Sequence, residues 1–255
     1  MSQKHGFIIF GILVTIGVIL RSFMLIFTID HNNGFIKNQY TPLIIVMAVL
    51  LLVAAALVFF VFFYQKKNIL KLKKPNRFVF AISEALMAAA IIYEAFVSPL
   101  LDYITGFQLV FHKVTSLISA AALIYMCACR FTKMEYPKII TIAPVLFWLT
   151  RVITVFTEFA TLATVTDTVL ETISMCLALV VFLSFSKQQC CVEIKNQQLN
   201  LATTVLCGYF CALSSVPRFI CALIIPNAFG YFGNIPALTT FAAGIFVTIA
   251  ALNKE

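Results

Sequence analysis

The sequence predicts an all-α polytopic membrane protein, a bundle of about eight transmembrane helices. Of the 255 residues, 62% are hydrophobic and only 11% are charged, whereas a soluble domain has about 45 to 50% apolar and about 25% charged residues. A helix needs about 20 mostly apolar residues to cross a bilayer. Runs of this length predict spans at 6–28, 42–64, 77–98, 108–129, 138–160, 165–186, 200–224 and 235–252. Their short connections predict that residues 1–255 form a single transmembrane domain.

The first span is predicted to be a retained helix. Lys4 and His5 precede its apolar run, as basic residues precede the apolar core of a signal peptide. The run continues to Thr28, however, without a small-x-small cleavage site.

Basic residues gather in the connection between the second and third spans. Six of the 18 lysines and arginines lie between Lys66 and Arg77. Because loops rich in Lys and Arg face the cytoplasm, this loop and both termini are predicted to lie inside a multi-pass cell-membrane protein. The loop is either an anchor beside anionic lipid headgroups or a docking strip for a cytoplasmic partner. The net charge of +8 is spread over the inner loops, which argues against nucleic acid as a partner and leaves the lipid bilayer as the main one.

Charged and polar residues inside the spans are the candidate ligand-binding residues. Each charged member lies in the outer half of the membrane when its depth is counted at about 1.5 Å per residue from the outer end of its helix. A charge facing lipid costs about 2.5 to 3.5 kcal/mol on insertion scales, so these groups must face one another or water. The set comprises Arg21, Glu94, His112, Lys113, Trp148, Arg151, Glu158, Glu171 and Arg218.

Helical periodicity places polar residues of four spans on single faces. In the fifth span they recur at steps of three and four, which is the spacing of one helix face. Shorter stripes follow in the fourth, sixth and seventh spans, and Pro217 beside Arg218 predicts a bend or break in the seventh. The stripes are Thr141, Pro144, Trp148, Arg151, Thr154 and Glu158; His112, Ser116 and Ser119; Thr164, Asp167, Glu171 and Ser174; and Cys207, Cys211, Ser214 and Arg218.

A repeated helical hairpin is suggested by two outer loops. "DHNNGF" begins at Asp30 and "DYITGF" begins at Asp102, so D-x-x-x-G-F recurs at the same topological place. The alternative is that Asp, Asn and Gly simply suit helix exits and turns.

The eight cysteines are predicted to be small buried thiols. Cys127-x-Cys129 and Cys190-Cys191 would both lie near the inner face, where a thiolate metal site is the alternative. Neither pair has CxxC spacing or a nearby histidine, so no metal and no cofactor is predicted.

The segments "LRSFMLIFTIDHNNGF" and "PVLFWLTRVITVF" resemble those of a family of small multi-span membrane proteins from Gram-positive anaerobic bacteria without an assigned function. The resemblance covers most of the chain loosely. It implies the bacterial cytoplasmic membrane and no particular activity.

Three functions fit the buried charges. The preferred one is a transporter or substrate-capturing membrane subunit with an outward-facing pocket for a small anionic or zwitterionic ligand, held by arginines. The second is a membrane enzyme for a lipid-linked or envelope substrate, with Glu158, Glu171 or His112 as general base; no catalytic motif supports it. The third is a structural or sensory accessory protein whose charges are only ion pairs. No GxxxxGK[ST] segment for ATP binding occurs.

Overall fold

The computed structural model describes residues 3–28, 40–64, 77–97, 106–159, 166–192, 196–224 and 236–252, and within them it is helical without strands. The side chains of several helix-end residues, Glu158 and Asp167 included, lie outside this description. All eight predicted helices are confirmed, with ends that differ by a few residues. They are α1 (Gln3–Phe23, continued by the π-helical η1, Met24–Thr28), α2 (Thr41–Phe63), α3 (Arg77–Val97), α4 (Gly106–Thr132), α5 (Ala143–Phe159, preceded by the 3₁₀ turn η4, Lys138–Ile142), α6 (Thr166–Gln189), α7 (Gln197–Ile224) and α8 (Pro236–Leu252).

Seven of these helices are long and apolar enough to cross a membrane. Helix α8 is shorter, with 17 residues. The outward faces are apolar, as on α1, where Ile8, Ile12, Ile16 and Ile19 recur at helical spacing and are 49 to 63% exposed. Such continuous apolar surface is stable only against lipid. The chain is therefore an integral, multi-pass membrane protein in contact with a bilayer.

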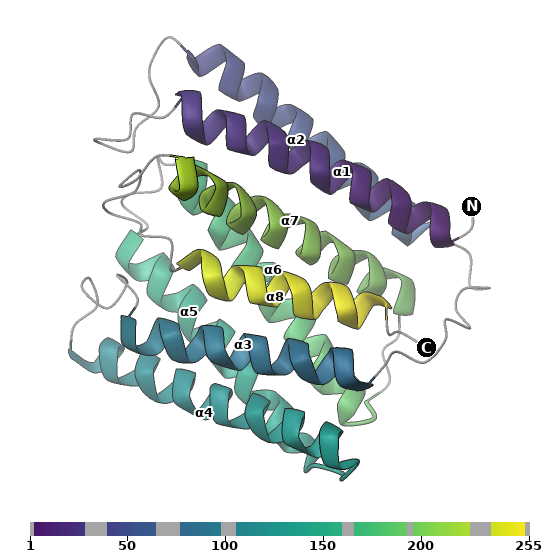
Figure 1. Cartoon of the computed structure of the whole chain (residues 1–255), viewed down its shortest axis with the longest axis vertical. Helices are drawn as coiled ribbons and strands as arrows, with labels where there is room; N and C mark the ends of the chain where they lie inside the picture. The colour runs from purple at the N-terminus through teal and green to yellow at the C-terminus, as the bar shows by residue number, and fades with distance from the viewer. Residues whose placement is uncertain are drawn as a thin grey trace.

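Helix α7 lies at the centre of the bundle (Figure 1). It packs against α1 and α2 on one side and against α6 and α8 on the other, while α8 also contacts α3. Helices α3, α4, α5 and α6 then follow one another in contact, so that α8 has α3, α6 and α7 around it. The ends of α3, α5, α6, α7 and α8 that the sequence predicts to face outward are thereby brought together.

An aromatic cluster fills the core between α3, α5, α6 and α8. The rings of Phe182 and Phe246 stack with centroids 4.9 Å apart, and Phe80 meets Phe246 edge-on at 5.2 Å. Trp148 of α5 adjoins Phe182 at 6.0 Å. Aromatic pairs of this kind contribute about 0.5 to 1.5 kcal/mol each beyond the area they bury, so this cluster holds the four helices together.

Pro217 does not break α7, contrary to one of the two outcomes expected from the sequence. The helix runs without interruption from Gln197 to Ile224, with Pro217 buried inside it. Buried neighbours on both sides hold this segment helical, as tertiary packing often does around a proline in a membrane.

Two sequence predictions fall outside the described residues. The repeated D-x-x-x-G-F loops begin in the stretches 29–39 and 98–105, and the basic loop occupies 65–76, so that only its last member, Arg77, is described at the start of α3. The hairpin repeat and the docking role of the loop stay predictions.

Candidate functional site

Two arginines and two glutamates form a buried chain of ion pairs across four helices. Arg151 of α5 donates from Nη1 to Oε2 of Glu94 on α3 at 2.6 Å and from Nη2 to Oε1 of Glu171 on α6 at 3.2 Å. Arg218 of α7 donates from Nη1 to the other oxygen of Glu171, at 2.8 Å. None of the four is more than 7% exposed. Their formal charges cancel, as the burial of ions requires. We call Glu94, Arg151, Glu171 and Arg218 the ion-pair chain.

Helix α8 adds a hydroxyl group to one end of this chain. Thr239 accepts a hydrogen bond from Nη1 of Arg151 and donates to Oε2 of Glu94 at 2.5 Å. The side chain is fully buried. One oxygen of Glu94 thus receives two donors while the other faces a different neighbour.

That neighbour is His112 of α4, whose Nε2 lies 3.9 Å from Oε1 of Glu94. This distance is beyond the usual hydrogen-bond range of about 2.7 to 3.2 Å. Among the described residues, neither ring nitrogen of His112 nor Oε1 of Glu94 has a hydrogen-bond partner. The nearby hydroxyl of Ser116 donates to the backbone carbonyl of His112 instead. His112 is thus fully buried, with both ring nitrogens unpaired among the described residues.

Aromatic side chains border the site. Trp148 lies one turn before Arg151 on α5, with its ring centroid 5.6 Å from the guanidinium carbon. Phe147 places its ring 6.2 Å from that of His112. A cation near the face of an indole is stabilised by about 0.5 to 2 kcal/mol, and the same rings keep water from the ion pairs.

The periodicity of the sequence assigned the buried faces correctly. The stripe residues whose side chains are described are all buried: His112, Ser116, Ser119, Thr141, Pro144, Trp148, Arg151, Thr154, Glu171, Ser174, Cys207, Cys211, Ser214 and Arg218. Four of the nine predicted ligand-binding residues form the ion-pair chain, and His112 and Trp148 adjoin it.

The remaining three predicted residues are Arg21, Lys113 and Glu158. Arg21 is buried on α1 at 3% exposure, and Lys113 is half-buried on α4. Neither belongs to the ion-pair chain. The side chain of Glu158 lies outside the described residues. A binding role for these three stays a prediction.

Thr239 was missed by the sequence analysis. The available signal was modest: Thr239 and Thr240 are adjacent polar residues near the start of an otherwise apolar helix. A hydroxyl in a membrane helix usually bonds to a carbonyl of its own helix, so its link to an ion pair on other helices is not visible from spacing.

Arg130 and Glu84 form another ion pair, toward the opposite end of α3. Arg130 of α4 donates from Nε to both oxygens of Glu84 at 2.8 Å and from Nη2 to the hydroxyl of Tyr136 at 3.3 Å. Burial raises the pKa of the Tyr136 hydroxyl, which keeps its proton for donation to Gln189 on α6 at 3.2 Å. This inner pair ties α3, α4 and α6 together.

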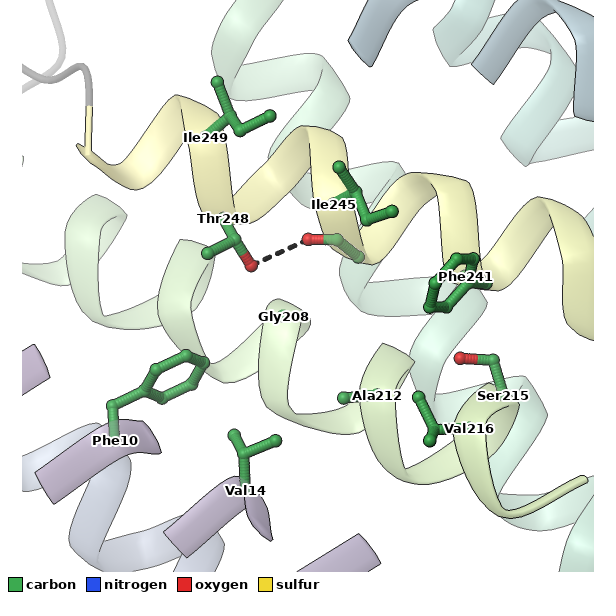
Figure 2. A pocket seen from close by; sticks show the side chains of 11 residues that line it. Phe10, Val14, Gly208, Ala212, Ser215, Val216, Phe241, Ile245, Thr248 and Ile249 are labelled. Atoms are coloured by element: carbon green, nitrogen blue, oxygen red, sulfur yellow. Dashed lines mark hydrogen bonds between the residues drawn. The ribbon is translucent and has the colours of Figure 1, made fainter. Parts of the chain in front are cut away.

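A groove of about 270 Å³ lies between α1, α7 and α8 (Figure 2). Its only hydroxyl groups, those of Ser215 and Thr248, donate to carbonyls of their own helices, at Cys211 and Gly244 respectively. The groove therefore offers hydrocarbon contact and no site for a charge. The other lining residues are Phe10, Val14, Gly208, Ala212, Val216, Phe241, Gly244, Ile245 and Ile249.

The cysteines follow the prediction in part. All eight are free thiols, and five of them are buried, but Cys176, Cys190 and Cys191 are exposed. Cys176 lies on an outward face of α6, and the other two follow its last turn. In the described part of the chain, no group of three or more potential metal ligands occurs.

Comparison with protein-family models, curated proteins and solved structures finds no match for this chain.

Proposed function

We propose that this protein binds a small anionic or zwitterionic ligand at the ion-pair chain, as a transporter or as the substrate-capturing subunit of one. The location we propose is the bacterial cytoplasmic membrane, which the resemblance noted from the sequence implies. The chain has no ATP-binding segment of the GxxxxGK[ST] type, so uphill transport would draw on an ion gradient or on a partner, for which the basic loop at 66–77 offers a docking strip.

The observation that supports this proposal is the pair of arginines on one carboxylate. Arg151 holds one oxygen of Glu171 and Arg218 holds the other, at 3.2 and 2.8 Å. Two guanidinium groups from different helices form the arrangement by which proteins recognise carboxylate and phosphate groups. The Glu171 carboxylate occupies the position that a ligand carboxylate would take.

Ligand binding is then an exchange of carboxylates. The four side chains are buried here, so the bundle is in a closed conformation with Glu171 as internal ligand. An incoming anion replaces Glu171 between the two arginines. For a zwitterionic ligand, the released Glu171 side chain receives the ammonium group, which keeps the charges paired in the low-dielectric interior.

The test compares two arginine-to-lysine substitutions of identical chemistry. The protein in lipid nanodiscs is titrated with inorganic phosphate, succinate, L-glutamate and L-alanine, and binding is read as a rise in melting temperature. Arg218→Lys replaces a planar guanidinium group by a point charge, and we expect it to reduce affinity for the ligand that stabilises the wild type by about ten- to hundredfold, which is about 1.4 to 2.7 kcal/mol.

Arg130→Lys is the matched control, because Arg130 also pairs with a buried glutamate but at the other end of α3. It is expected to lower stability without changing ligand affinity. If no probe stabilises the wild type, or if both substitutions act alike on stability alone, the ion-pair chain is only a structural lock.

A further inference from the structure

Glu94 and His112 differ from the other buried charged groups in having unused acid–base atoms that face each other. Both side chains are fully buried, and Oε1 of Glu94 and Nε2 of His112 lie 3.9 Å apart. Neither atom has a hydrogen-bond partner among the described residues, although buried polar atoms are nearly always hydrogen-bonded.

The two glutamates of the ion-pair chain are not equivalent. Each oxygen of Glu171 accepts from an arginine, so a proton there would displace a charge-assisted bond. In Glu94, Oε2 takes both donors, Arg151 and Thr239, and Oε1 takes none. A proton added to Oε1 disturbs no existing bond. An approach of about 1 Å would also let that proton bridge to Nε2 of His112 at a normal hydrogen-bond distance.

Charge balance links such a proton to an anionic ligand. The ion-pair chain is neutral with two arginines and two glutamates. An added anion would leave a net negative charge on the ion-pair chain, at a cost of several kcal/mol for an uncompensated buried ion. One proton taken up with the anion restores neutrality. It also cancels the charge of Glu94 and so releases much of the attraction that holds Arg151 to it.

Among the residues that the structure describes, the charged groups around Glu94 are few. Helix α4 presents His112 and the half-buried Lys113, α5 presents Arg151, α6 presents Glu171, and α7 presents Arg218. Helix α8 has no titratable residue. The side chains of Glu158 and Asp167, near the outer ends of α5 and α6, lie outside the description.

We infer that Glu94 and His112 form a proton-binding site that is loaded together with the anionic ligand, so that the protein couples ligand uptake to a proton gradient. The inference rests on the proposed function. The proton comes from water, adds to the lone pair of Oε1 or Nε2, and belongs to the pair and not to one residue. Buried carboxylate and histidine pairs serve as proton carriers in membrane transporters in general.

Trp148 is the only tryptophan in the chain, and its position beside Arg151 makes it a reporter for the site. The emission of the protein in nanodiscs is recorded between about pH 5 and pH 9, the range in which a histidine titrates. We expect one transition in the wild type and none in Glu94→Gln, which keeps an acceptor for Arg151 and Thr239. Glu84→Gln, which removes a buried carboxylate that lies outside the ion-pair chain, should leave the transition in place.

The coupling itself is measured on the wild type, so it does not depend on a variant that folds. The affinity for succinate or inorganic phosphate is expected to fall about tenfold per pH unit above the transition, because binding takes up a proton. A pH indicator in weakly buffered medium should record about one proton removed from solution per ligand bound.

The outcomes separate the two proposals. Binding with no proton uptake and no pH dependence overturns the proton site and leaves the anion site intact. If no probe binds, the anion site fails, and proton coupling fails with it. The Trp148 titration then shows whether the Glu94 and His112 pair takes up a proton in the absence of a ligand.

Discussion

Among single residues, Arg151 shows most directly how a charge is kept in a membrane helix. Its guanidinium group contacts Glu94, Glu171 and Thr239 and adjoins the ring of Trp148. Glu94, Glu171 and Thr239 lie on three different helices, whereas Trp148 lies on the same helix as Arg151. Arg151 therefore links α5 to three other helices and also neutralises two carboxylates. Removing any one of these contacts should weaken the others.

Replacing Thr239 tests this connection with minimal change of shape. Thr239→Val removes the hydroxyl and leaves Arg151 and Glu94 each with one hydrogen bond fewer in a buried place. We expect a loss of about 1 to 3 kcal/mol in stability, the cost of unsatisfied buried groups. The measurement is the melting temperature in nanodiscs.

Thr248→Val is the control for that substitution, since Thr248 lies on the same helix and its hydroxyl donates only to the carbonyl of Gly244. It should change stability by less than about 0.5 kcal/mol. Equal effects at the two positions would show that the Thr239 hydroxyl contributes nothing through the ion pair.

At the level of helices, the contact of α7 with α8 places Thr239 against the ion-pair chain. Gly244 permits it: a Cβ at this position would lie 3.0 Å from Cβ of Cys211 on α7, an atom that moves only with its backbone. Small residues allow such close approach between membrane helices. The geometry of the site thus depends on a glycine that is not part of it.

Gly244→Ala should therefore push α8 away from α7 by a few tenths of an ångström. We expect a loss of about 1 to 3 kcal/mol from overpacking, together with weaker ligand binding because Thr239 moves. Gly11→Ala, in α1, meets nothing within 4 Å and should stabilise the protein by up to about 1 kcal/mol through helix propensity. A Gly244→Ala protein as stable as the wild type would mean that this contact does not position α8.

For the whole molecule, the orientation in the membrane is a prediction that the arrangement of the helices does not test. Cys190 and Cys191 are exposed thiols between α6 and α7, on the side assigned to the cytoplasm by the basic residues. A membrane-impermeant maleimide should label them in inside-out vesicles and not in right-side-out vesicles. The Cys190→Ser, Cys191→Ser double variant should lose the label, and labelling only from the outside would reverse the topology.

Eight helices, their approximate ends and their buried faces follow from the sequence. Bilayer thickness sets the length of each span, and the 3.6-residue period sets which side chains share a face, so both are local properties. The α5 stripe from Thr141 to Thr154 is one example, since each described member is buried. The common depth of Glu94, Arg151, Glu171 and Arg218 also followed from counting along the chain.

Which of those residues contact one another was decided only by the tertiary structure. Arg151 meets Thr239, 88 positions later, because α8 lies among α3, α6 and α7, an arrangement set by long-range packing and not by any local pattern. The same packing places one arginine against each oxygen of Glu171 and leaves Oε1 of Glu94 facing His112. The sequence alone determined that buried charges must share a layer, because lipid cannot solvate them. Helix packing decided which carboxylate oxygen each arginine contacts. Such a contact depends on how helices far apart in the chain are rotated and spaced relative to one another.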